Sequence, residues 1–195
     1  NNIDFHEFAS TGNFTDFGDF VATRFERVAV SNSTRGVFFG GAVAPNFYNN
    51  IEFLTIASTG SANDFGDLID GRQAAGAAAN ATRGLAVGGN SPSNDEIEYI
   101  TFSTTGNAVD FGDCSVDIWN IRGGNCGNAV RGLMAGGEPG ASNAIQYVTI
   151  STLGNTVDFG DRSVAKSQIA HMSSTTRAVF AGAGEKDTNV ADYVN

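Results

Sequence analysis

The sequence predicts an all-β fold, and three observations lead to that prediction. The 195 residues include 25 Gly and 15 Phe but only 3 Pro; Gly is costly inside helices, whereas aromatic and β-branched residues favour strands. One sequence unit recurs four times, at spacings of 46 to 48 residues. Each copy contains short apolar runs closed by Gly instead of a helical periodicity. A chain of this length buries enough surface to fold without disulfides.

The repeat consists of two shared segments separated by variable ones. The first begins with Ile and ends in Asp-Phe-Gly-Asp in every copy, and the second contains an Arg and ends in Gly-Gly in three copies. The units occupy residues 3–50, 51–96, 97–144 and 145–190. Residues 191–195 begin a fifth copy, because Ala191–Val194 stands in the register of Ile3–His6. We treat residues 1–195 as one domain, since this period is typical of stacked or circular repeats.

Each unit contains four candidate strands, which the second unit illustrates. Residues 51–59 alternate with the period of a half-buried strand, and residues 85–87 form an apolar run closed by Gly-Gly. We expect a third strand around residues 64–69 and a fourth over residues 74–79. Four short strands in about 47 residues are typical of a propeller blade. The prediction is about four blades of four antiparallel strands, either as a four-bladed ring or as part of a longer array.

The units resemble a known repeat family. A strand ending in Gly-Gly, a variable loop, an aromatic residue such as Tyr99 or Tyr147, and then a basic residue such as Arg24, Arg72 or Lys166 look like kelch-type repeats of galactose-oxidase-like β-propellers. Kelch units carry a Trp about six residues after the aromatic residue, whereas here a Phe follows at twelve. The whole pattern is more similar to repeats in structural and tail-fibre proteins of marine bacteriophages. This resemblance implies a structural or adhesion role in a virion.

The charge of the chain excludes one class of partner. The net charge is -10, which opposes binding to nucleic acid and to anionic membranes. No apolar run approaches the length of a spanning helix, so we expect no membrane insertion. Eight of the 14 Asp belong to the repeated Asp-Phe-Gly-Asp motif, and we therefore expect much of the acidity to be structural.

We interpret the two repeated motifs as parts of the frame. The Phe is expected to pack between blades, the Gly to form a turn, and one Asp to cap backbone amides or pair with the recurring Arg. The Arg is expected to form a partly buried ion pair or to contact a backbone carbonyl. Calcium binding by the paired Asp is the alternative. These residues are Asp16, Asp19, Asp64, Asp67, Asp110, Asp113, Asp158, Asp161, Arg35, Arg83, Arg131 and Arg177.

No catalytic constellation is expected. The chain has 2 His and 2 Cys and lacks the kinase, sialidase, phosphate-loop and hydrolase motifs. We therefore predict no enzyme, no catalytic residues, no metal site and no cofactor, with Ca²⁺ as the one alternative. A disulfide between Cys114 and Cys126 is left open, because bridging requires Cα atoms within about 7 Å.

The loops after Gly-Gly differ between units, and variable loops on a repeated frame are how such folds build binding surfaces. Unconstrained solvent loops are the alternative interpretation. Phe47 and Tyr48 are the best contact candidates, for a sugar or for a neighbouring subunit. The full set of candidate loop residues is Phe47, Tyr48, Asn94, Asp95, Glu138, Glu185 and Asp187.

The functional hypothesis is a non-catalytic structural or recognition module of a phage particle or extracellular appendage. Its partners would be other structural subunits, copies of itself or a cell-surface glycan. A secreted glycan-binding, lectin-like propeller is the alternative, and an enzyme accessory domain is a third hypothesis.

The duplicated strand leads to a prediction about pairing. Residues 3–8 and 191–194 occupy the same position of the unit, so only one of them can pair with the strand over residues 179–182. We expect residues 191–194 to take that place, because they close the shorter loop. An unpaired N-terminal edge would then invite another chain or a further unit.

Overall fold

The computed structural model describes residues 1–90, 95–121, 124–138, 142–182 and 191–194, and this part of the chain is all-β. Its eighteen strands form antiparallel sheets of two to four strands, without any helix. Accordingly, the described residues contain no helix with the length and apolar character needed to cross a membrane. The prediction of an all-β, antiparallel fold is confirmed.

Five sheets, numbered here 1 to 5, follow one another along the described chain. Sheet 1 pairs β1 (Asn2–Phe5) with β2 (Thr15–Asp19). Sheet 2 has the order β3 (Val28–Ser31), β4 (Arg35–Phe39), β7 (Asn50–Thr55) and β8 (Asn63–Asp67). In sheet 3 the order is β9 (Gly76–Ala79), β10 (Arg83–Val87), β11 (Glu96–Thr101) and β12 (Val109–Asp113).

The two remaining sheets have three strands each. Sheet 4 contains β13 (Arg131–Ala135), β14 (Ala144–Thr149) and β15 (Val157–Asp161). Sheet 5 contains β16 (Ala170–Ser173), β17 (Ala178–Ala181) and β18 (Ala191–Val194). A separate small hairpin, β5 (Ala42–Val43) and β6 (Asn46–Phe47), lies in the connection between β4 and β7.

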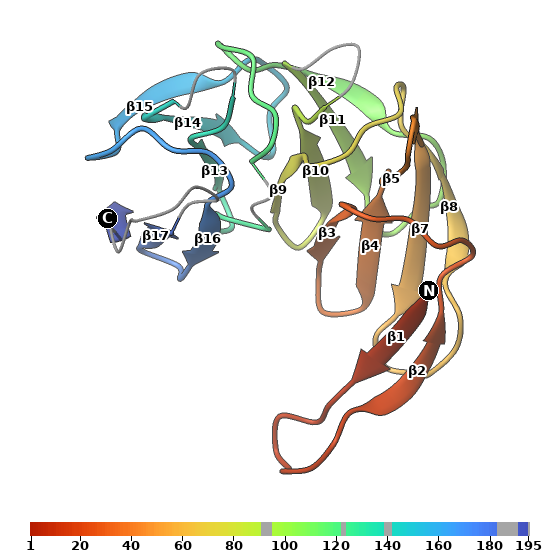
Figure 1. Cartoon of the computed structure of the whole chain (residues 1–195). Helices are drawn as coiled ribbons and strands as arrows, with labels where there is room; N and C mark the ends of the chain where they lie inside the picture. The colour runs from red at the N-terminus through yellow and green to blue at the C-terminus, as the bar shows by residue number, and fades with distance from the viewer. Residues whose placement is uncertain (91–94, 122–123, 139–141, 183–190, 195) are drawn as a thin grey trace.

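The sheets form an open arc, with sheet 1 at one end and sheet 5 at the other (Figure 1). They do not coincide with the sequence units. Sheet 3, for example, takes β9 and β10 from the second unit, whereas β11 and β12 carry the opening segment of the third. Every sequence unit therefore spans two neighbouring sheets, and the chain itself links each sheet to the next.

The core lies between neighbouring sheets. One cluster joins Val30 and Val37 of sheet 2 to Ala79 and Ala86 of sheet 3. A Cβ on Gly84 of β10 would lie only 2.6 Å from Cγ2 of Val30. Because Gly has no side chain, β10 can approach β3 of the neighbouring sheet closely.

The predicted strands of the second unit are present, with shifted bounds. The strand expected over residues 64–69 is β8, and the one expected over residues 74–79 is the shorter β9. The pairing prediction is also confirmed, because β17 pairs with β18, and β1 pairs with β2 alone among the described strands. Cys114 and Cys126 are both buried and free, so the open question of a disulfide is answered in the negative.

Candidate interaction surface

Neighbouring sheets are connected three times by the same hydrogen bonds, in a contact that we call the inter-sheet joint. The outer strand of one sheet, which carries Asp-Phe-Gly-Asp, meets the Gly-containing turn before the outer strand of the next sheet. The Phe carbonyl accepts a hydrogen bond from the N–H of the turn Gly at 2.7 to 2.8 Å. The carbonyl of the second Asp accepts a hydrogen bond at 2.8 Å from the N–H of the residue two positions after that Gly. The Phe–Gly pairs are Phe17 and Gly60, Phe65 and Gly106, and Phe111 and Gly154.

The Gly of the motif is required by this close approach. Gly66 has φ +149°, and a Cβ there would lie 2.3 Å from the carbonyl oxygen of Gly106. A Cβ on Gly18 or Gly112 would lie 2.5 or 2.6 Å from the turn of the next sheet. Gly160 has a similar φ of +134°, but a Cβ there would meet nothing within 4 Å. Among the described residues, the fourth copy of the motif thus has the sequence of the joint without its contact.

The Phe side chains of the motif belong to the core, as predicted. Each ring lies edge-on to the aromatic ring of the adjacent strand, with centroids 5.8 to 6.0 Å apart. Aromatic pairs favour this geometry. The rings of the first three copies are buried and that of the fourth is partly buried: Phe17, Phe65, Phe111 and Phe159.

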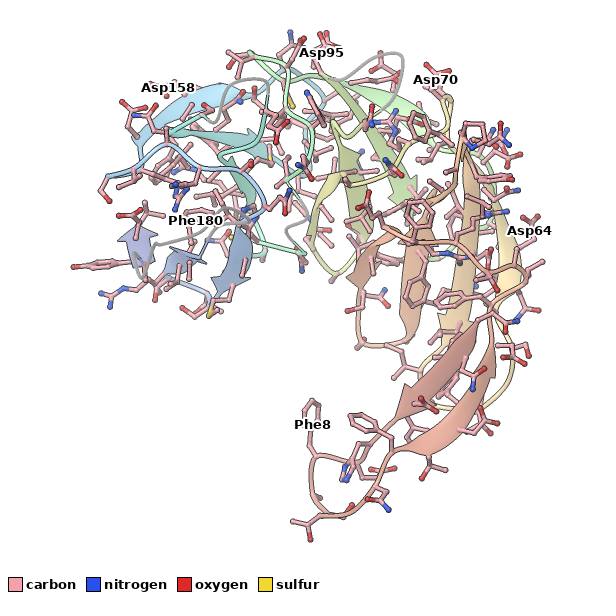
Figure 2. All side chains as sticks on the ribbon, viewed as in Figure 1. Phe8, Asp64, Asp70, Asp95, Asp158 and Phe180 are labelled. Carbon is pink, nitrogen blue, oxygen red and sulfur yellow. The ribbon has the colours of Figure 1, made fainter. Side chains whose placement is uncertain are left out.

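The first Asp of the motif caps the backbone in two copies. Oδ1 of Asp110 accepts a hydrogen bond from the Gly112 N–H at 3.0 Å, and Oδ1 of Asp158 accepts one from the Gly160 N–H at 3.2 Å. Figure 2 shows Asp64 and Asp158 at the outer rims of their sheets, far from each other. The predicted capping role is confirmed for these two copies.

The recurring Arg stacks on an aromatic ring of the adjacent strand. Its guanidinium carbon lies 4.5 to 4.7 Å from the ring centroid in all four copies, which are Arg35 on Phe53, Arg83 on Tyr99, Arg131 on Tyr147 and Arg177 on Tyr193. Cation–π attraction contributes on the order of 1 kcal/mol at such sites. Arg35 also donates to the Phe102 carbonyl, and Arg83 donates to the Ile150 carbonyl at 3.1 Å. The predicted carbonyl contact is therefore confirmed for these two Arg.

The structure also contains buried ion pairs that the sequence pattern had not predicted. Arg72 contacts Glu96 at 2.9 Å and also binds the carboxylate of Glu98, which is 0% exposed. Burial raises the pKa of Glu98 to about 7, although the charge of Arg72 opposes that shift. Glu52 is similarly buried and lies 3.2 Å from Arg27.

One signal in the sequence could have revealed these pairs. Glu52, Glu98 and Gln146 occupy the same position of the repeat, inside a strand that is otherwise apolar. A buried acid needs a partner. The neutral Gln occurs in the copy where Ser115 contacts it and where no Arg does so among the described residues.

The candidate loop residues have different surroundings. Phe47, at the end of the β5–β6 hairpin, is 39% exposed, and the neighbouring ring of Tyr48 lies 4.4 Å from the guanidinium carbon of Arg24. Asp95 accepts a hydrogen bond from the Cys114 N–H through its carbonyl, at 2.7 Å. These loops leave corresponding ends of their sheets, because each connects equivalent strands.

The remaining loop candidates are only partly described. The Glu138 carboxylate accepts a hydrogen bond from the Asn120 side chain at 3.1 Å, so it is tied to the frame. Asn94, Glu185 and Asp187 lie outside the described residues.

Metal binding has no support from a cluster in the described ranges. Within them, no group of three or more His, Cys, Asp or Glu side chains gathers in a way that could hold an ion. The chain matches no protein-family model and no curated protein.

Stability should fall in mild acid because of His171. Burial lowers the pKa of this residue to about 4, and its ring lies edge-on to Phe180. An unfolded His titrates near 6.5, so the unfolded chain binds the proton first. The resulting stability is fully present above about pH 6.5 and is lost as the pH falls towards 4, by roughly 2–3 kcal/mol.

The measurement is urea unfolding at a series of pH values, with His171→Gln as the control. The difference between the two proteins should shrink between pH 6.5 and 4. Parallel profiles over this range would contradict the prediction.

Proposed function

We propose that the five sheets are blades of a kelch-like β-propeller array, and that the chain is a non-catalytic structural or recognition module of a phage particle or extracellular appendage. The observation that carries the proposal is the contrast between the joints and the loops. Three joints repeat the same hydrogen bonds within 0.1 Å, whereas the loops after Gly-Gly differ in length and sequence. A rigid repeated frame with divergent loops is suited to recognition.

The loop after the first Gly-Gly contains the best contact candidate for recognition. The β5–β6 hairpin holds Phe47 at the surface, and the stacking of Arg24 on Tyr48 fixes the neighbouring ring. An ordered, exposed aromatic side chain loses little entropy on binding and is typical of binding hot spots. The acidic surface disfavours nucleic acid and anionic membranes as partners.

Two measurements test the proposal. Antibodies against the chain should decorate intact particles or appendages of the source organism at one ordered position in electron micrographs, and labelled protein should give no signal on a glycan array. A glycan signal that Phe47→Ser abolishes would favour the lectin alternative. Absence of the chain from all particles and appendages would overturn the proposal.

The loop itself is tested by one substitution and its control. Phe47→Ser should reduce attachment of the purified chain to particles at least tenfold, while stability changes by less than about 0.5 kcal/mol. Leu153→Ser alters an exposed apolar residue on a turn away from this loop and should leave attachment unchanged. Equal effects of both substitutions would show that the loop has no special role.

A further inference from the structure

The first repeat exposes side chains whose counterparts in other repeats are buried between neighbouring sheets. Phe8 is 109% exposed and its second-unit counterpart Ile56 is 46% exposed, whereas the counterparts in the third and fourth units, Phe102 and Ile150, are buried. Asp4 is exposed, whereas Glu98 at the same position is buried. Figure 2 shows Phe8 on the loop that extends from β1, away from the rest of the molecule. The N-terminal strand pair thus presents groups that the third and fourth units bury.

The fourth copy of the motif carries the opposite half of a joint. The carbonyls of Phe159 and Asp161 have none of the turn contacts that their counterparts make in the three joints, as far as the described residues extend. A small pocket beside them is lined by Arg131, Leu133, Phe159, Ala178 and Val194, among others. The equivalents of Leu133 and Phe159 share a core cluster with Phe102. This pocket is therefore the place that a Phe8-type side chain occupies in the unit register.

A buried cation marks the same edge. Arg162 is buried, and neither its Nε nor its Nη1 makes a hydrogen bond with any described residue. Its Nε lies 3.5 Å from Oδ2 of Asp192, which also lacks a hydrogen-bond partner. The buried Arg72 also has an Nε without a hydrogen bond, but its two terminal nitrogens are bonded to Gly88, Glu96 and Glu98. The acidic group offered by β18 satisfies Arg162 incompletely.

We propose that this edge binds the strand pair β1–β2 of a second copy of the chain, which takes the place of β18 and completes sheet 5. β17 would then pair with the partner copy's β1 in the register seen between β4 and β7. The turn N–H groups of Gly12 and Phe14 would bond to the carbonyls of Phe159 and Asp161, and Phe8 would enter the pocket. The Arg131 guanidinium would donate to the carbonyl of Phe8, as Arg35 donates to that of Phe102.

The exchange replaces one strand by a chemically equivalent one. Asp4 would stand in for Asp192 beside Arg162, and Phe5 would lie under Arg177 in place of Tyr193. Phe5 is suited to this place, because Arg35 already stacks on a Phe in sheet 2. The lost β17–β18 hydrogen bonds are regained, and the additional contacts of the turn and of Phe8 favour the exchange.

A second copy is a better occupant than the chain's own N-terminus. β1–β2 is held against sheet 2 by the Phe17–Gly60 joint, and the arc places it at the opposite end from sheet 5 (Figure 1). β1 therefore keeps one edge open to another molecule, and such an edge favours association. β17 becomes open to it when β18 leaves. Head-to-tail contacts of this kind build rings or filaments. The inference goes beyond the proposed function and does not depend on it.

The first test is the mass of the purified chain in solution as a function of concentration. We expect reversible association, weakened at least tenfold by Phe8→Ser, which touches no buried group of the free chain. Phe14→Ala also removes an exposed ring, but it introduces the residue that Ala62 and Ala108 provide in other joints. It should keep association within about threefold. A monomer at all concentrations, or equal losses in both variants, would overturn the proposal.

The second test locates the contact. Ala181 pairs with Ala191 in the register of β17 and β18, so Ile3 of a second copy would replace Ala191. A mixture of Ile3→Cys and Ala181→Cys chains should form a covalent dimer under mild oxidation, because directly opposed residues suit a disulfide. Asp4→Cys faces the other side of the strand and should not. The native thiols are buried, and burial raises the pKa of Cys126 to about 11.

The same substitutions distinguish self-closure. A chain carrying both Cys would cross-link internally, at the mass of a monomer, if its own β1 reached β17. That result, together with no dimer in the mixture of single variants, would overturn the proposal.

Discussion

Replacing Arg72 with Met should lower the free energy of unfolding by about 3–5 kcal/mol, the usual cost of breaking a buried ion pair. The guanidinium of Arg72 is 1% exposed and is bonded to the Gly88 and Glu96 carbonyls and to two carboxylates. Its loss leaves the carboxylate of Glu98 in the core without a cation. Urea unfolding, followed by the fluorescence of the single Trp119, measures the change.

A double substitution provides the control. Gln146 shows that the repeat accepts a neutral amide at the position of Glu98, where it is hydrogen-bonded by Ser115. Arg72→Met combined with Glu98→Gln should therefore recover a substantial part of the lost stability, since no uncompensated charge remains. A double variant as unstable as the single one would show that Arg72 acts through its backbone contacts, not through the carboxylate.

Replacing Phe111 with Ala should destabilise the chain by about 3–5 kcal/mol, as expected for a buried aromatic residue. Phe111 is 2% exposed, packs edge-on against Tyr99 at 6.0 Å, and shares a core cluster with Ile97 and Val148. Its removal leaves a cavity between sheets 3 and 4 whose walls are held by the joint. Chemical denaturation gives the difference directly.

Phe159 is the matched control, because it occupies the same place in the motif and makes the same edge-on contact with Tyr147. It is only partly buried, so Phe159→Ala should cost clearly less than Phe111→Ala. Equal losses would indicate that the aromatic pair, and not the contact between sheets, provides the stability. A change below about 0.5 kcal/mol at Phe111 would contradict its place in the core.

The sequence alone determined the all-β class, the period and most strand positions, because these depend on local patterns. Alternating residues, Gly-Gly endings and the recurring motif predict β8 and β9 within a few residues. The preference of β17 for β18 over β1 also followed from loop length, a property of the chain itself. The loop candidates could be named only as variable positions.

The tertiary structure decided which groups meet, because those contacts lie between units that sequence spacing does not place side by side. Arg35 was expected to contact an acid or a carbonyl, but its stacking on Phe53 and its bond to the Phe102 carbonyl come from neighbouring strands and sheets. Glu98 finds Arg72 across 26 residues. The role of the motif Gly likewise became clear only at the joint, where the Gly106 carbonyl leaves no room for a Cβ on Gly66.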